Sequence, residues 1–177
     1  MHGYFLRQLQ PYVEYHRDPR NGAMHVVGII FLFLGATLPL TAVPVTVVGV
    51  QTTLAVLLSL PVLLYWLLLD VALGLAIVAA AVVLLSVAAL IVGHTGTAAM
   101  WTICAVLIAL GLGSQAIGHQ VFEGRAPSIK DNPSHILLGP MFVMAKLFIA
   151  LGFRDDLAAI IQSSPQASGR AVDKSAR

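Results

Sequence analysis

Two clusters of polar residues in this chain carry side chains that could hold a metal ion. One cluster precedes a long apolar stretch and the other follows it: Tyr12, His16, Asn21 and His25, then Gln115, His119 and Glu123. The last three are spaced four residues apart, so we expect them to share one face of a helix. Imidazole and carboxylate ligands suit iron, zinc, copper or manganese, and two or three histidines with one carboxylate are typical of non-haem Fe(II) oxygenases. The candidate catalytic residues and metal ligands are therefore His16, His25, His119 and Glu123.

Some polar residues also have plainer interpretations. Glu123 could orient a ligand histidine or pair with Arg125 instead of binding metal. Asn21 is as well suited to capping the helix that follows as to a site. Asp70 is expected to cap a helix, and His94 is expected to be a loop residue on the opposite side of the membrane.

The composition predicts a polytopic membrane protein. Hydrophobic residues make up 58% of the chain and charged residues 10%, and the mean hydropathy is +0.89. Between Asn21 and Phe122 the only charged side chain is Asp70, and so uncharged a stretch requires lipid as its solvent. The net charge of +2 comes from short basic clusters, so nucleic acid is not an expected partner. The single cysteine, Cys104, cannot form an intramolecular disulfide.

We expect an all-α membrane helical bundle in a single catalytic domain, residues 1–162, with a disordered tail, 163–177. Four spans are predicted, at about 23–40, 50–69, 71–92 and 98–118. A fifth apolar run, 136–153, is marginal in length, and His135 precedes it. We favour a re-entrant or interfacial helical pair there, broken at Gly139-Pro140. An amphipathic helix in residues 3–16 is expected to lie on the membrane surface, with one face that contains Phe5, Leu9, Tyr12 and His16.

The positive charges predict the orientation in the membrane. Basic residues flank the apolar block, namely Arg7, Arg17, Arg20, Arg125 and Lys130, whereas the loops 39–49 and 93–97 contain no lysine or arginine. By the positive-inside rule, the N-terminus, the turn at Asp70 and residues 119–134 face the cytoplasm. An even number of crossings brings both polar clusters to the same mouth of the bundle. We therefore expect one active site on the cytoplasmic face of a multi-pass protein, in a bacterial inner membrane or the endoplasmic reticulum.

Two stretches carry a family resemblance. Y-x-x-x-H-R-D-P-R-N-x-x-x-H-x-x-G (12–28) and Q-x-x-G-H-x-x-F-E-G-R-x-P (115–127) resemble the two signatures of the 2-hydroxy fatty acid dioxygenase family. D-N-P…G-P-M-F (131–142), L-G-F-R (151–154) and L-D-x-x-x-G (69–74) resemble weaker parts of the same pattern. The chain departs from the family at Lys146, because an acidic residue is usual shortly after G-P-x-F.

The resemblance implies an Fe(2+)-dependent enzyme that needs no oxoglutarate. It implies oxidation of a 2-hydroxy fatty acid with O2 to the acid one carbon shorter, and His16, His25 and His119 match histidines expected at the iron site. A 2-hydroxy carboxylate can chelate a metal through its hydroxyl and one carboxylate oxygen, which brings the reactants together on one ion. The acyl chain would lie between the spans. Candidate substrate-binding residues are Tyr12, Asn21, Gln115 and Arg125.

Three other interpretations stay open. A membrane zinc hydrolase acting on a lipid amide or ester would use the same residues. A b-type cytochrome would need two histidines that face each other, such as His25 and His119. A lipid or ion transporter without catalysis would predict charges near the middle of the bilayer, and no predicted span carries one at its centre.

Overall fold

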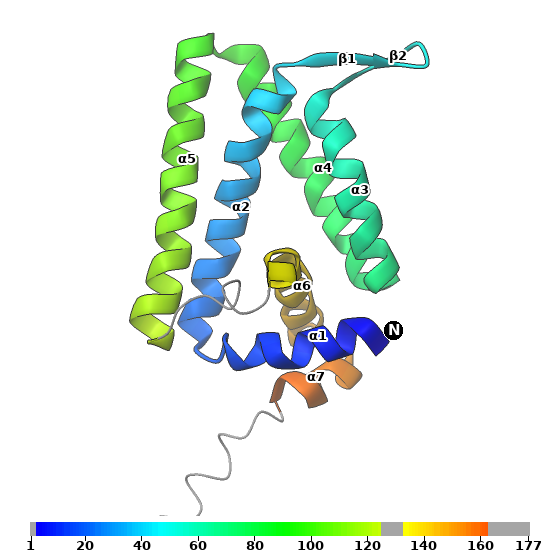
Figure 1. Ribbon diagram of the computed structural model, residues 1–177, viewed down its shortest axis with the longest axis vertical. Helices are drawn as coiled ribbons and strands as arrows, with labels where there is room; N and C mark the ends of the chain where they lie inside the picture. Colours follow the sequence, from blue (N-terminus) through cyan, green and yellow to red (C-terminus); the bar gives the residue numbers. More distant parts are fainter. Residues whose placement is uncertain (1–2, 125–132, 163–177) are drawn as a thin grey trace, which may run out of the picture.

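The computed structural model describes residues 3–124 and 133–162. The described chain is almost wholly helical, with one short hairpin (Figure 1). In chain order the elements are α1 (Gly3–Glu14), α2 (Pro19–Thr41), β1 (Pro44–Val47), β2 (Val50–Thr53), α3 (Leu54–Leu69), α4 (Val71–His94), α5 (Thr97–Ile117), the π-helix η1 (Gly118–Glu123), the 3-10 helix η3 (Pro133–Leu137), α6 (Leu138–Ala150) and α7 (Asp155–Gln162). The predicted tail, 163–177, lies outside the described residues, and so do Arg125 and Lys130.

Within the described residues, three helices are long and apolar enough to cross a membrane. They are α2, α4 and the continuous helix Thr97–Glu123 formed by α5 and η1. The bent pair of α6 and α7 makes up to four if it counts as one span. The structure therefore supports a membrane helical bundle, whereas the predicted four spans are confirmed only in part.

The predicted second span, 50–69, is wrong at its start. Helix α3 has 16 residues, fewer than the about 20 that a straight span needs. The preceding residues, Val50–Thr53, pair with Pro44–Val47 as an antiparallel hairpin. Valine and threonine favour extended backbone, and Val48 and Gly49 both adopt positive φ, as a two-residue hairpin turn requires. Helix α3 therefore begins at Leu54, four residues later than the span predicted from the apolar pattern.

The fifth apolar run forms two helices, but the predicted break is misplaced. Gly139 and Pro140 lie in the first turn of α6, where a proline costs no helical hydrogen bond. The chain bends by 116° between α6 and α7. Gly152 and Arg154, both with positive φ, lie at this bend. The arrangement fits either a broken span or a re-entrant pair.

Helix α1 lies across one end of the bundle, beside α6 and α7 (Figure 1). The predicted apolar face is confirmed, since Phe5, Leu9 and Tyr12 are all buried. These side chains pack in one core cluster with Phe142 of α6 and Leu157 of α7. The protein itself therefore covers the apolar face of this helix, and His16 follows directly after it.

Helices α2 and α5 pack closely because glycines face each other. A Cβ at Gly28 would lie 2.6 Å from Gln115 Nε2 and 3.1 Å from the Gly111 carbonyl oxygen. A Cβ at Gly111 would lie 2.7 Å from Leu32 Cγ. Such close approach through small residues is common between membrane helices. It brings the first turns of α2 beside the last turns of α5.

The ends of the helices confirm one prediction, for Asp70, and correct two others, for Asn21 and His94. Asp70 caps α4, where its side chain accepts from the Leu73 N–H at 3.1 Å, and it also pairs with Arg154. Asn21 does not cap the helix that follows, because Asp18 occupies that position and accepts from the Arg20 N–H. His94 is the last residue of α4 rather than a loop residue, and its Nδ1 bonds to the Leu90 carbonyl oxygen.

Candidate metal centre

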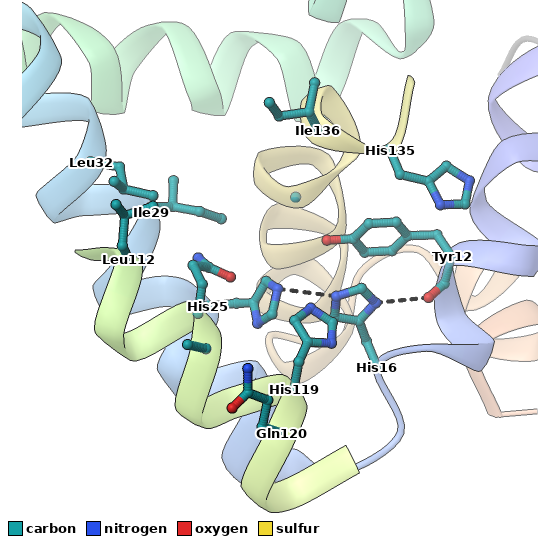
Figure 2. A pocket seen from close by; sticks show the side chains of 13 residues that line it. Tyr12, His16, His25, Ile29, Leu32, Leu112, His119, Gln120, His135 and Ile136 are labelled. Atoms are coloured by element: carbon teal, nitrogen blue, oxygen red, sulfur yellow. Dashed lines mark hydrogen bonds between the residues drawn. The ribbon is translucent and has the colours of Figure 1, made fainter. Parts of the chain in front are cut away.

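Three histidines from separate parts of the chain meet at one end of the bundle (Figure 2). His16 follows α1, His25 lies in the second turn of α2 and His119 lies in η1. All are buried, and each offers a ring nitrogen within 4.8 Å of those of the others. The ring centroids are 4.5 to 4.9 Å apart. The two polar clusters of the sequence therefore converge in space.

The hydrogen bonds of two of these rings determine where their protons lie. His16 Nδ1 donates to the Tyr12 carbonyl oxygen at 2.8 Å, and His25 Nδ1 donates to the Asn21 carbonyl oxygen at 3.1 Å. A carbonyl oxygen can only accept, so each Nδ1 carries a proton. In a neutral imidazole the other nitrogen is then an unprotonated acceptor. Both Nε2 atoms consequently present lone pairs to the same small space.

These two Nε2 atoms lie only 3.1 Å apart. Burial is the main cause that lowers the pKa of His16 to about 3, and the charge of the neighbouring His25 is the second. This ring is therefore neutral at physiological pH. Two acceptors at this distance repel each other unless a cation binds both. Ligands about 2.1 Å from a metal ion and at right angles to each other lie about 3 Å apart. The spacing and the donor type thus fit a shared metal ion.

The third histidine strengthens the fit. His119 Nδ1 is buried and has no hydrogen-bond partner among the described residues. An unpaired polar atom in the interior is costly, so it indicates a missing ligand or ion. Three imidazoles leave coordination positions open, as catalytic metal sites require.

The histidines form one wall of a cavity of about 390 Å³. Tyr12 stacks on His16 with ring centroids 4.0 Å apart, and its hydroxyl points into the cavity (Figure 2). Burial raises the pKa of this hydroxyl well above its usual value, so it stays protonated and can donate. Gln115 also lines the cavity, and Ile29 and Leu112 lie on the wall away from the metal centre. The cavity thus joins a polar end to an apolar end.

Glu123 is not part of the group of three histidines whose ring nitrogens converge. Its Oε1 accepts from the Asp18 N–H at 2.9 Å and from Asn21 Nδ2 at 3.0 Å. The predicted face of regular α-helical spacing ends at Gly118, where the chain continues as a π-helix. The wider π-helical turn changes the directions of residues four positions apart. Glu123 therefore ties the end of η1 to the start of α2.

The remaining candidates differ in position. Asn21 is fully buried and serves the contact with Glu123 rather than the cavity wall. Arg125 lies outside the described residues. Lys146 Nζ lies 5.2 Å from the Phe142 ring centroid, and a Cβ on Gly22 would be 3.1 Å from it. Lys146, the departure from the family pattern noted in the sequence, thus places its positive charge beside Gly22. Gly22 lies about one helical turn before His25 on α2.

One histidine of the cavity, His135, is not among the site residues predicted from the sequence. His135 of η3 lines the cavity and is buried, and neither of its ring nitrogens has a hydrogen-bond partner within the described part of the chain. It packs edge-on against Tyr12, at 5.4 Å between ring centroids, and Tyr12 in turn stacks on His16. Its position just before an apolar run was the only available signal.

Comparison with known proteins identifies the family. No curated protein and no solved structure matches this chain. The family model described as "2-hydroxy-palmitic acid dioxygenase Mpo1-like" matches residues 3–151, a range that contains all of the histidines above and most of the chain. The chain thus belongs to the Mpo1-like family, whose name denotes dioxygenases of 2-hydroxypalmitic acid.

Proposed function

We propose that this protein is an Fe(II)-dependent, oxoglutarate-independent dioxygenase that shortens 2-hydroxy fatty acids by one carbon. The observation that carries the proposal is the pair of unprotonated Nε2 atoms of His16 and His25, 3.1 Å apart beside His119. Family membership supports the substrate class. We assign the metal-binding role to these three histidines.

The reaction balances without a further reductant. A 2-hydroxy acid and one O2 together contain the atoms of the shortened acid, carbon dioxide and water. Converting the hydroxyl-bearing carbon to a carboxyl group, with release of the old carboxyl carbon as carbon dioxide, supplies all the electrons that O2 accepts. Release of that carbon as formate would need an additional reductant. A bound Fe(II) would supply the redox chemistry, and it is an ion that a 2-hydroxy carboxylate can chelate.

The residues of the cavity position the reactants. The Tyr12 hydroxyl and the Gln115 amide lie on the cavity wall with the histidines and can donate to the substrate carboxylate. The Nδ1 hydrogen bonds of His16 and His25 hold both rings in the tautomer that leaves Nε2 free to bind metal. The buried position of the histidines limits the access of water.

A combined metal and turnover assay tests the proposal. Protein purified without oxygen should contain iron, and Fe(II) with 2-hydroxypalmitate should give O2 uptake together with pentadecanoate. Stoichiometric zinc, together with hydrolysis of a lipid amide or ester, would instead support the hydrolase. Iron-loaded protein that consumes no O2 with this substrate would contradict the dioxygenase.

The cytochrome interpretation is disfavoured by the geometry of the histidines. The rings of His25 and His119 lie 4.9 Å apart and nearly perpendicular to each other. This separation leaves no room for a porphyrin plane between them. We therefore expect no Soret band from the purified protein.

Glu123 should act by positioning the metal centre rather than by binding metal. In Glu123→Gln the amide oxygen can still accept from Asp18 and Asn21, so full iron loading is expected at saturating Fe(II), with slower turnover. In Glu123→Ala both hydrogen bonds are lost, and metal affinity should fall by about 10–100-fold. Iron stoichiometry measures both effects. A Glu123→Gln protein that cannot be loaded at any iron concentration would make the carboxylate a ligand.

We also propose that the metal centre faces the cytoplasm, on the basis of the lysine and arginine distribution. In a Cys104→Ala background, a cysteine at position 45 of the hairpin should react with an impermeant thiol reagent from outside. A cysteine at position 20, beside the metal centre, should react only after the membrane is opened. Labelling of both positions from the same side would refute this orientation.

A further inference from the structure

A second cavity lies beside the histidine cavity, and its walls are wholly apolar. It has a volume of about 320 Å³ and is lined by residues of α2, α3, α4 and α6. Its wall includes Trp66, Ile77 and Ala80. The indole N–H of Trp66 donates to the Leu137 carbonyl oxygen at 2.7 Å, so this polar group is already satisfied. Nothing on this wall among the described residues would hold a polar or charged ligand.

The two cavities meet at one side chain, that of Ile29, which lines both. Next to it, Gly139 lines the histidine cavity and Pro140 lines the apolar one. A Cβ on Gly139 would lie 3.2 Å from Ile29 Cδ1, so α2 and α6 approach closely at this point. Rotation of one isoleucine side chain between its staggered conformers, without backbone movement, could therefore connect the two spaces.

The apolar cavity also reaches the outer surface of the bundle. Three of its lining residues remain exposed, Val26 at 38%, Ile30 at 37% and Val83 at 61%. They belong to α2 and α4, two of the helices that are long and apolar enough to span a membrane, so their exposed side chains would face lipid. A single-chain amphiphile could enter sideways from the bilayer without passing through water.

We propose that the apolar cavity receives the distal part of the substrate's acyl chain and that Ile29 is the gate the chain passes. This inference rests on the proposed function, which places the hydroxy acid head at the histidines. Ile29 lies on the apolar wall of the histidine cavity, and the space behind it accepts only an aliphatic group. A chain that leaves lipid gains little from apolar burial alone. The cavity therefore selects for chain length instead of strengthening the binding of every hydroxy acid.

Filling the cavity tests the inference. In Ala80→Phe, a ring from α4 occupies the space assigned to the distal chain. For 2-hydroxypalmitate, kcat/KM should fall by about tenfold or more, the size of effect that a few misfitted methylenes produce. For 2-hydroxyoctanoate, which lacks the distal carbons assigned to this cavity, kcat/KM should stay near the wild-type value. The ratio of the two constants is the readout.

Ala79→Phe is the matched control. Ala79 precedes Ala80 on α4, is exposed and does not line the cavity, so the same substitution should leave the ratio unchanged. An equal fall for both substrates in Ala80→Phe, or no fall for either, would overturn the inference. An equal fall is also the result expected if the cavity holds a structural membrane lipid.

Photo-crosslinking of the wild-type protein gives a readout that needs neither turnover nor a stable variant. A 2-hydroxypalmitate analogue with a diazirine at its terminal carbon should label α4 or α6 near Ala80 and Pro140, as located by mass spectrometry. Label confined to α1 or α5 would overturn the inference. Wild-type protein that is labelled at α4 but turns over no hydroxy acid would refute the proposed function and leave the acyl-chain site supported.

Discussion

Replacing His16, His25 or His119 with alanine is expected to remove the bound metal and reduce turnover to background. Each substitution deletes one of the three nitrogens that converge within 4.8 Å. The loss of metal affinity or activity should exceed about 100-fold, which is the largest effect typical of a residue that only orients a metal ligand. Iron stoichiometry and O2 uptake with 2-hydroxypalmitate, measured on the same preparations, test this expectation.

His94→Ala is the matched control for these substitutions. His94 is exposed and ends α4, and α5 separates it from His119 by a helix length of about 30 Å. Neither iron content nor turnover should change. If His119→Ala kept full iron and full turnover, the assignment of the metal centre would be wrong.

A single methyl group at Gly118 should also disrupt the site. An added Cβ would collide with Asn21 Oδ1 and would lie 3.3 Å from Met24 Cβ. Asn21 is fully buried, and its Nδ2 is held by Glu123, so it cannot readily turn away. The start of η1 would have to move away from α2 and take His119 with it. A displacement of about 1 Å can cost about 100-fold in rate, and we expect a loss of this size in Gly118→Ala.

Gly113→Ala provides the comparison on the same helix. An added Cβ there meets nothing within 4 Å, and alanine is favoured over glycine in a helix by about 1 kcal/mol. This variant should keep its iron and activity and should melt at the same or a slightly higher temperature in detergent. Equal activity in the Gly118 and Gly113 variants would mean that the close packing beside His119 does not position the metal centre.

Much of the architecture follows from local properties of the sequence. The near absence of charge between Asn21 and Phe122 predicts helices in lipid, because an unpaired backbone polar group has no partner there except within its own helix. The spacing of Phe5, Leu9 and Tyr12 predicts an apolar face on α1, because these positions fall on one side of a helix. The prediction places that face on the membrane surface, whereas the structure packs it against α6 and α7. Asp70 could be recognised as a cap because its side chain bonds only three residues along the chain.

The histidine cluster could also be anticipated in part. His16, His25 and His119 flank the apolar block, and the four crossings predicted from the sequence, an even number, would bring both flanks to one side. The sequence therefore indicates which residues should meet. It does not indicate which ring nitrogen faces the metal, since that depends on hydrogen bonds to the Tyr12 and Asn21 carbonyl oxygens.

Only the tertiary structure decided the details that depend on how helices pack. The π-helical turn after Gly118 directs Glu123 to Asn21, which regular helical spacing does not predict. The hairpin before α3 shortens an apolar run that hydropathy alone extends into a full span. His135 reaches the histidine cavity from a segment distant in the chain. The apolar cavity behind Ile29 likewise lies between helices that are distant in the chain. Side-chain periodicity describes one element at a time, whereas a cavity exists only where several elements fail to fill the space between them.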